Sequence, residues 1–196
     1  MLTIVELDRA AVQAGVAVVK GATESDLARP TPCAEWDLRA LLDHMTVQHN
    51  GFAAAARGLG GDPAVWRTGG ERPDPIADYL DSADAVLAAF AESGVSERDF
   101  LLPEIHSSAT FPGAVAIGFH LVDYVVHGWD VARALGLAFD PGSEVTAAAL
   151  HIAERVPSGP ARLVSGSAFA PVLPAAGGSA LDRTLRLLGR SPNWTA

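Results

Sequence analysis

The stretch FHLVDYVVHGWDVARALG, residues 119–136, carries polar, ligand-capable side chains on one side of an otherwise apolar segment. The four side chains concerned are His120, Asp123, His127 and Asp130. Their spacings of three, four and three residues place them in a single stripe if the segment is an α-helix. Because a helix buried among apolar residues does not ordinarily carry such a stripe, the pattern predicts a helical fold with a functional site on this helix.

The spacing within the stripe is compatible with metal coordination. Asp123 and His127 are one turn apart, so a carboxylate oxygen and an imidazole nitrogen can meet on one divalent ion beside the helix. His120 and His127 are two turns, roughly 10 Å, apart and cannot both bind that ion. Asp123 with His127, or His120 with Asp123, therefore remain as pairings. We prefer the first, because Asp130 can then orient the imidazole of His127. The competing interpretation is a buried Asp–His hydrogen bond.

A third ligand has to come from another segment, and His44 in DLRALLDHMTVQHNGF, residues 37–52, is the best donor. The apolar stripe of that segment consists of Leu38, Leu41, Leu42, Met45 and Phe52. His44 lies at the edge of this stripe, where it can face another helix. His49 lies about 140° further round and is a weaker candidate. A single histidine at such a position is also commonly a hydrogen-bonded core residue, so this alternative stays open.

Cap residues and apolar periodicity predict the remaining elements. Thr3 with Glu6 forms a capping box, and Asp37 and Asp74 are good N-caps. The expected helices cover residues 3–20, 37–57, 74–94, 112–136, 143–156 and 179–188, with residues 95–111 irregular and one short strand near residues 169–173. The economical fold is mainly all-α: an antiparallel four-helix bundle over residues 1–138, with residues 139–196 as a small helical and irregular appendage packed on it.

Composition limits the partners and the location. The chain has 196 residues, of which 49% are hydrophobic and 19% charged, as in a soluble globular protein. A net charge of −9 without a basic cluster argues against a nucleic-acid partner. Cys33 is the only cysteine, so no intramolecular disulfide is expected. Without a signal peptide or a long apolar run, we expect a cytoplasmic protein that does not contact the membrane.

Three segments together resemble a known family. They are TPCAEWDLRALLDHM (31–45), HLVDYVVHGWDVARALG (120–136) and LDRTLRLLGRSPNW (181–194). Their motifs and order resemble the actinobacterial branch of the DinB-like superfamily, close to the N-terminal domain of the mycothiol-dependent maleylpyruvate isomerases. The resemblance implies a DinB-like bundle with a divalent metal, zinc or nickel, held by His44, Asp123 and His127. At position 123 this chain has aspartate, whereas the resemblance to the isomerases implies glutamate there. The shorter aspartate side chain should still reach the ion.

The resemblance also implies a function. In the related isomerases the thiol of mycothiol adds to a substrate double bond, permits rotation and leaves. We therefore expect a metal-dependent isomerase or S-transferase that acts on a small molecule with a low-molecular-weight thiol, and His120 is a candidate proton shuttle. The arginines Arg155, Arg162 and Arg183 are candidates for anion binding by position alone. The alternative is a non-catalytic metal-binding or ligand-binding bundle, with a homodimer as a candidate assembly.

Overall fold

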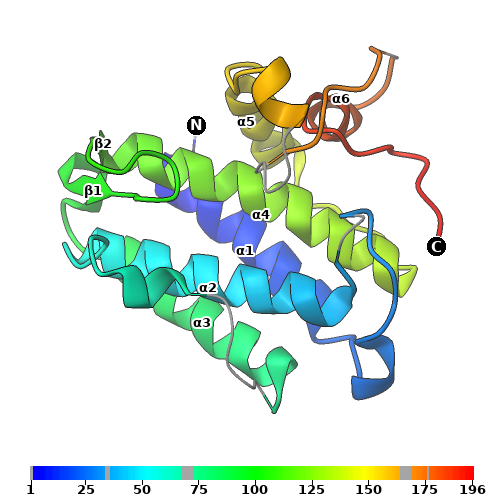
Figure 1. Cartoon of the computed structure of the whole chain (residues 1–196), viewed down its shortest axis with the longest axis horizontal. Coiled ribbons are helices and arrows are strands. Elements are labelled where there is room, and N and C mark those ends of the chain that lie inside the picture. The colour runs from blue at the N-terminus through cyan, green and yellow to red at the C-terminus, as the bar shows by residue number, and fades with distance from the viewer. Residues whose placement is uncertain (1, 34–35, 68–72, 164–168, 176) are drawn as a thin grey trace.

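Four long helices make up the main body of the computed structural model, which describes residues 2–33, 36–67, 73–163, 169–175 and 177–196. They are α1 (Ile4–Val19), α2 (Leu38–Ala56), α3 (Pro75–Phe90) and α4 (Gly113–Leu135) (Figure 1). Short 3-10 helices cover Glu24–Asp26, Pro63–Trp66, Val95–Glu97 and Pro160–Leu163. The predicted mainly helical, DinB-like fold is confirmed.

The helix ends follow the predicted caps. Thr3 and Glu6 form the capping box of α1. The side chains of Asp37 and Asp74 accept hydrogen bonds from backbone N–H groups in the first turns of α2 and α3, at 2.9 and 3.0 Å. Helix α4 ends at Gly136, which adopts the left-handed conformation with φ of 70°. These local interactions satisfy backbone groups that have no partner within the helix, and they set where each helix begins or ends.

The helices run as two parallel pairs, α1 with α4 and α2 with α3, and the pairs are antiparallel to each other (Figure 1). Arg57 directly follows α2, and Glu92 lies two residues beyond α3. The two side chains form an ion pair at 3.0 Å, so these two helices end on the same side of the bundle. Phe52 near the end of α2 shares a core cluster with Ile117 near the start of α4. A parallel pair needs a connection that returns along the bundle, which explains the long segment 57–74 between α2 and α3.

A two-stranded hairpin precedes α4, in the stretch for which we expected irregular structure. Strands β1 (Asp99–Leu101) and β2 (Thr110–Pro112) pair antiparallel, with Phe100 opposite Phe111. Three-residue strands are too short to show a period of two, and so the sequence pattern does not reveal them. The intervening loop contacts α2, because the Gln48 side chain donates a hydrogen bond to Glu104 at 2.6 Å.

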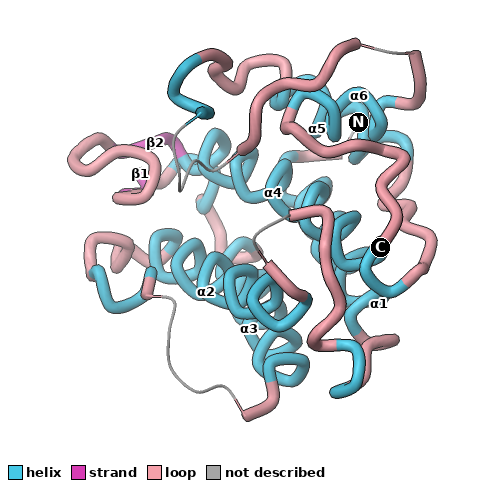
Figure 2. Tube along the Cα trace, turned by 45° about the vertical axis from the view of Figure 1, so that its right-hand side comes forward, coloured by secondary structure: helices cyan, strands magenta, loops and turns pink. Residues whose placement is uncertain are grey.

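Beyond α4 the chain adds two shorter helices, α5 (Ser143–Ala153) and α6 (Ala180–Leu187), which lie on the side of α4 away from α2 and α3 (Figure 2). Helix α5 packs against α4 and α1, and α6 packs against α5. Gly142, not Ser143, occupies the N-cap position of α5. The predicted strand near residues 169–173 is wrong: the described residues 169–175 form none, and Pro171 and Pro174 lack the N–H groups that a strand needs. The predicted division at residue 138 stays a prediction.

No helix in the described part of the chain has both the length and the apolar character needed to cross a bilayer.

Candidate metal centre

Helices α2 and α4 bring His44, Asp123 and His127 together. One ligand atom from each residue lies within 4.8 Å of the ligand atoms of the other two, so these three residues, which we call the cluster, can hold a metal ion. Within it, His127 Nε2 is 3.4 Å from Asp123 Oδ1. The ring centroids of His44 and His127 are 5.2 Å apart, with the rings nearly perpendicular. Of the two pairings that the sequence leaves open, the structure thus assembles Asp123 with His127.

Asp130 holds the other nitrogen of the His127 ring. His127 Nδ1 lies 3.0 Å from Asp130 Oδ2, and Asp130 is fully buried. In the tautomer with its proton on Nδ1, His127 donates to Asp130 and leaves the lone pair of Nε2 free for a metal ion. The predicted contact of Asp130 with His127 is therefore present, and its role in orienting the ring of His127 stays a prediction. Metal-binding histidines in proteins ordinarily have such a partner on the second ring nitrogen.

Arg190 extends this arrangement from the C-terminal part of the chain. Its Nη2 lies 3.4 Å from Asp130 Oδ2 and 3.7 Å from Cys33 Sγ, and its Nη1 donates to the carbonyl oxygen of Leu188 at 2.9 Å. Arg190 is only 4% exposed. A buried carboxylate needs a compensating charge, and Arg190 supplies it to Asp130 behind His127.

The environment keeps His44 in the neutral form. Burial is the main cause that lowers its pKa to about 4, with further lowering by His127 and Arg190 and an opposing effect of Asp123. A neutral imidazole has the lone pair that a metal ligand requires. Trp36 packs over the same rings, with its centroid 4.6 Å from that of His44 and 6.1 Å from that of His127.

His120 belongs to a different set of contacts. Its Nδ1 lies 2.7 Å from Asp8 Oδ1 on α1, and its side chain is fully buried. The weaker candidate His49 likewise lies outside the cluster, with Nδ1 3.1 Å from Ser82 Oγ on α3. The proton-shuttle role of His120 stays a prediction, because His120 is not among the described residues whose ligand atoms converge.

Sequence reasoning missed Arg190 and selected three other arginines. Arg162 is buried and donates to the backbone carbonyl oxygens of Pro157, Val156 and Leu187. Arg183 forms an exposed pair with Glu154, and Arg155 donates to a backbone carbonyl one turn before it. Nothing local distinguishes Arg190 in RLLGRSPNW from these residues. Its partner Asp130 is sixty positions earlier in the chain.

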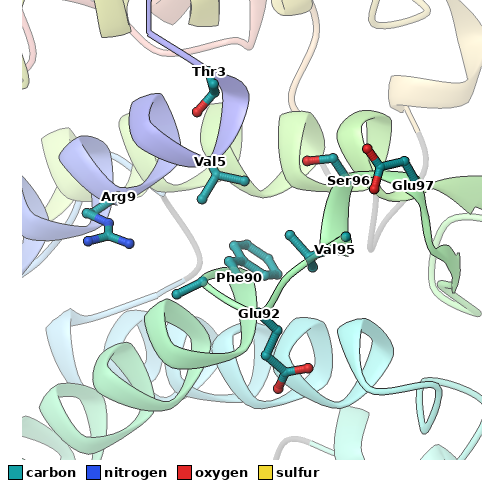
Figure 3. Close-up of a pocket in the computed structure, with 10 residues that line it drawn as sticks. Thr3, Val5, Arg9, Phe90, Glu92, Val95, Ser96 and Glu97 are labelled. Carbon is teal, nitrogen blue, oxygen red and sulfur yellow. The ribbon is translucent and has the colours of Figure 1, made fainter.

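A cavity of about 330 Å³ lies at the other end of the bundle, where α1 begins and α3 ends (Figure 3). Phe90 and Val95 line it together with the charged side chains of Arg9, Glu92 and Glu97. None of its lining residues belongs to the cluster of His44, Asp123 and His127. The cavity is therefore separate from the three residues whose side chains offer metal ligands.

The fold and the cluster define a helical-bundle protein with a two-histidine, one-aspartate group that can hold a metal ion. Comparison with known families is in agreement. The chain belongs to the family of the mycothiol maleylpyruvate isomerase N-terminal domain, which matches residues 9–132. All three cluster residues lie inside the match, whereas Arg190 lies beyond it.

Two curated relatives are uncharacterised proteins of Mycobacterium tuberculosis, MT0763 of strain CDC 1551 / Oshkosh and Rv0738 of strain ATCC 25618 / H37Rv. Each is 30% identical to this chain over 171 residues, which cover 84% of either sequence. No solved structure matches the chain.

Proposed function

We propose that this protein is a divalent-metal-dependent enzyme that acts on a small molecule. The group activated by the metal would be either a low-molecular-weight thiol, namely mycothiol, or water. The reaction class is isomerisation or S-transfer. His44, Asp123 and His127 would hold the ion, zinc or nickel. The observation that carries the proposal is that these ligand atoms lie within 4.8 Å of one another. In addition, the other ring nitrogen of His127 lies 3.0 Å from the buried carboxylate of Asp130.

The residues fit such an ion by their chemistry. Two imidazole nitrogens and one carboxylate oxygen are ordinary ligands of zinc and nickel. His44 is neutral at pH 7, because burial lowers its pKa to about 4. Three protein ligands leave a coordination position for a further group, which distinguishes reactive from structural zinc sites. When bound, the ion would lower the pKa of a thiol or a water molecule toward neutrality.

The surrounding side chains have separate tasks. Asp130, with Arg190 behind it, fixes the orientation of His127. Trp36 packs against His44 and shields one side of the cluster from water. Asp123 keeps 22% of its side chain exposed, so a small molecule can approach from that side. These contacts support a site in which buried residues fix His127, while the partly exposed Asp123 faces the solvent.

Metal content is the first test. Protein purified without a histidine tag should contain about one zinc or nickel ion per chain by elemental analysis. The ion should be lost in His44→Ala and His127→Ala but retained in the control His151→Ala, which removes an exposed histidine on α5. Circular dichroism would verify that each variant folds. Full occupancy in folded His127→Ala would refute the ligand assignment.

Thiol dependence is the second test. The metal-loaded protein should convert maleylpyruvate, or transfer a thiol to an unsaturated acid, only when mycothiol is added, and His44→Ala should abolish the reaction. A protein that binds metal but shows no thiol-dependent or water-dependent turnover would favour the non-catalytic metal-binding alternative. A homodimer stays a prediction that sedimentation analysis can test.

A further inference from the structure

A second set of polar side chains lies in the bundle core, separate from the cluster of His44, Asp123 and His127. It takes one side chain from each long helix: Asp8 from α1, His49 from α2, Ser82 from α3 and His120 from α4. None of the four is more than 3% exposed. Two direct contacts join them in pairs, His120 Nδ1 to Asp8 Oδ1 at 2.7 Å and His49 Nδ1 to Ser82 Oγ at 3.1 Å. We call this set the polar layer.

The hydrogen atoms in one half of the layer can be assigned. The Ser82 hydroxyl donates to the backbone carbonyl oxygen of Tyr79 at 2.8 Å, so its oxygen is left to accept from His49 Nδ1–H. Burial, and secondarily His120, lowers the pKa of His49 well below its usual value. His49 is therefore neutral, and its Nε2 carries a lone pair rather than a proton.

Four buried atoms around the layer have no partner among the described residues. They are His49 Nε2, His120 Nε2, Asp8 Oδ2 and the hydroxyl oxygen of Tyr79. Burial raises the pKa of Tyr79, so its hydroxyl stays a donor. His49 Nε2 and Asp8 Oδ2 are acceptors. The Tyr79 hydroxyl needs an acceptor, whereas His49 Nε2 and Asp8 Oδ2 need donors, so a group that both accepts and donates can satisfy all three atoms.

The rings of Tyr79, His49 and His120 lie close together in the core. The His49 centroid is 5.2 Å from that of Tyr79 and 5.4 Å from that of His120. Tyr124 stacks against both histidines, at 4.0 and 4.1 Å, and so holds them beside each other. One water molecule can bridge two polar atoms up to roughly 6 Å apart. On α1, Gly15 leaves room for the Tyr79 hydroxyl, since a Cβ there would lie 2.8 Å from it.

We propose that the polar layer is a binding site for internal water, with one molecule accepting from the Tyr79 hydroxyl and donating to His49 Nε2. The same water, or a second one, bonds to His120 Nε2 or Asp8 Oδ2. The hydrogen-bonded chain then crosses the whole bundle from α1 to α3. Buried waters ordinarily make about three hydrogen bonds to polar groups that lack protein partners, as these do.

A second metal ion fits the layer less well. In the described part of the chain, the only group of three His, Cys, Asp or Glu ligand atoms within 4.8 Å of one another is His44, Asp123 and His127. Asp8, His49 and His120 therefore do not converge on one ion. A cation also cannot accept the proton of the Tyr79 hydroxyl, whereas water can.

The direct test is a crystal structure of the full chain at a resolution that shows ordered water. We expect a water peak within hydrogen-bonding distance of both the Tyr79 hydroxyl and His49 Nε2. Absence of such a peak overturns the proposal. A peak with anomalous scattering overturns it in favour of a metal. The His44→Ala, His127→Ala double variant lacks two ligands of the proposed metal centre. If this variant still contained about one ion per chain, the ion would lie in the polar layer and the water proposal would be overturned.

The second test uses the sign of a stability change. A water-bonded hydroxyl stabilises the fold, so Tyr79→Phe should lower the melting temperature. An unsatisfied hydroxyl is a penalty, so in that case Tyr79→Phe would leave the melting temperature unchanged or raise it, and the proposal fails. Tyr124→Phe is the matched control, because the Tyr124 hydroxyl donates directly to the backbone oxygen of Met45 and its loss should lower the melting temperature in either case.

Discussion

Replacing Arg190 by methionine tests whether the C-terminal part of the chain supports the proposed metal centre electrostatically. Arg190 is 4% exposed and Asp130 is fully buried, so the variant leaves a carboxylate in the core without its compensating charge. Removing one partner of a buried ion pair costs about 3–5 kcal/mol. The contact is long at 3.4 Å and Asp130 keeps the bond to His127, so we expect the lower end, about 3 kcal/mol.

The assay is urea unfolding of metal-free protein in the presence of a chelator, so that metal binding does not enter the free energy. A double-mutant cycle with Asp130→Asn isolates the pair, and we expect a coupling of about 1–3 kcal/mol. Arg183→Met is the control, because Arg183 pairs with Glu154 on the surface, where a pair contributes at most about 1 kcal/mol. If Arg190→Met cost no more than this control, or if the cycle showed no coupling, the supporting role of Arg190 would be refuted.

Three further changes test other parts of the structure. Asp130→Asn should weaken zinc binding about 10–100-fold, measured by competition with a chelator dye, because the orienting carboxylate is lost; unchanged affinity would contradict its role. Stability of the metal-free protein should fall as the pH drops from about 6.5 toward 4, because the pKa of His44 is lowered to about 4 and that of His49 is also lowered, so the unfolded chain binds more protons. Urea unfolding at several pH values checks this, and a flat profile would speak against it. Gly51→Ala should cost about 1–3 kcal/mol despite the better helix propensity of alanine, because its Cβ would lie 2.3 Å from the ring of Trp66. A raised melting temperature for this variant would mean that the ring moves aside freely.

Residues with local signals were predictable. Helix ends follow from Thr3, Asp37, Asp74 and Gly136, because a cap acts on backbone groups within one turn of itself. The stripe on α4 was visible, because helical periodicity turns spacing into a shared face. The same argument placed Asp130 one turn beyond His127.

The sequence by itself determined the helical class and the four long helices, and it offered His44, Asp123 and His127 as residues that can meet between α2 and α4. Only the tertiary structure decided the parallel pairing of α2 with α3, the assignment of His120 to Asp8, and the approach of Arg190 to Asp130. The physical reason is the same in each case. Periodicity and capping act within a few residues, whereas these contacts join segments far apart in the chain and depend on how the helices pack.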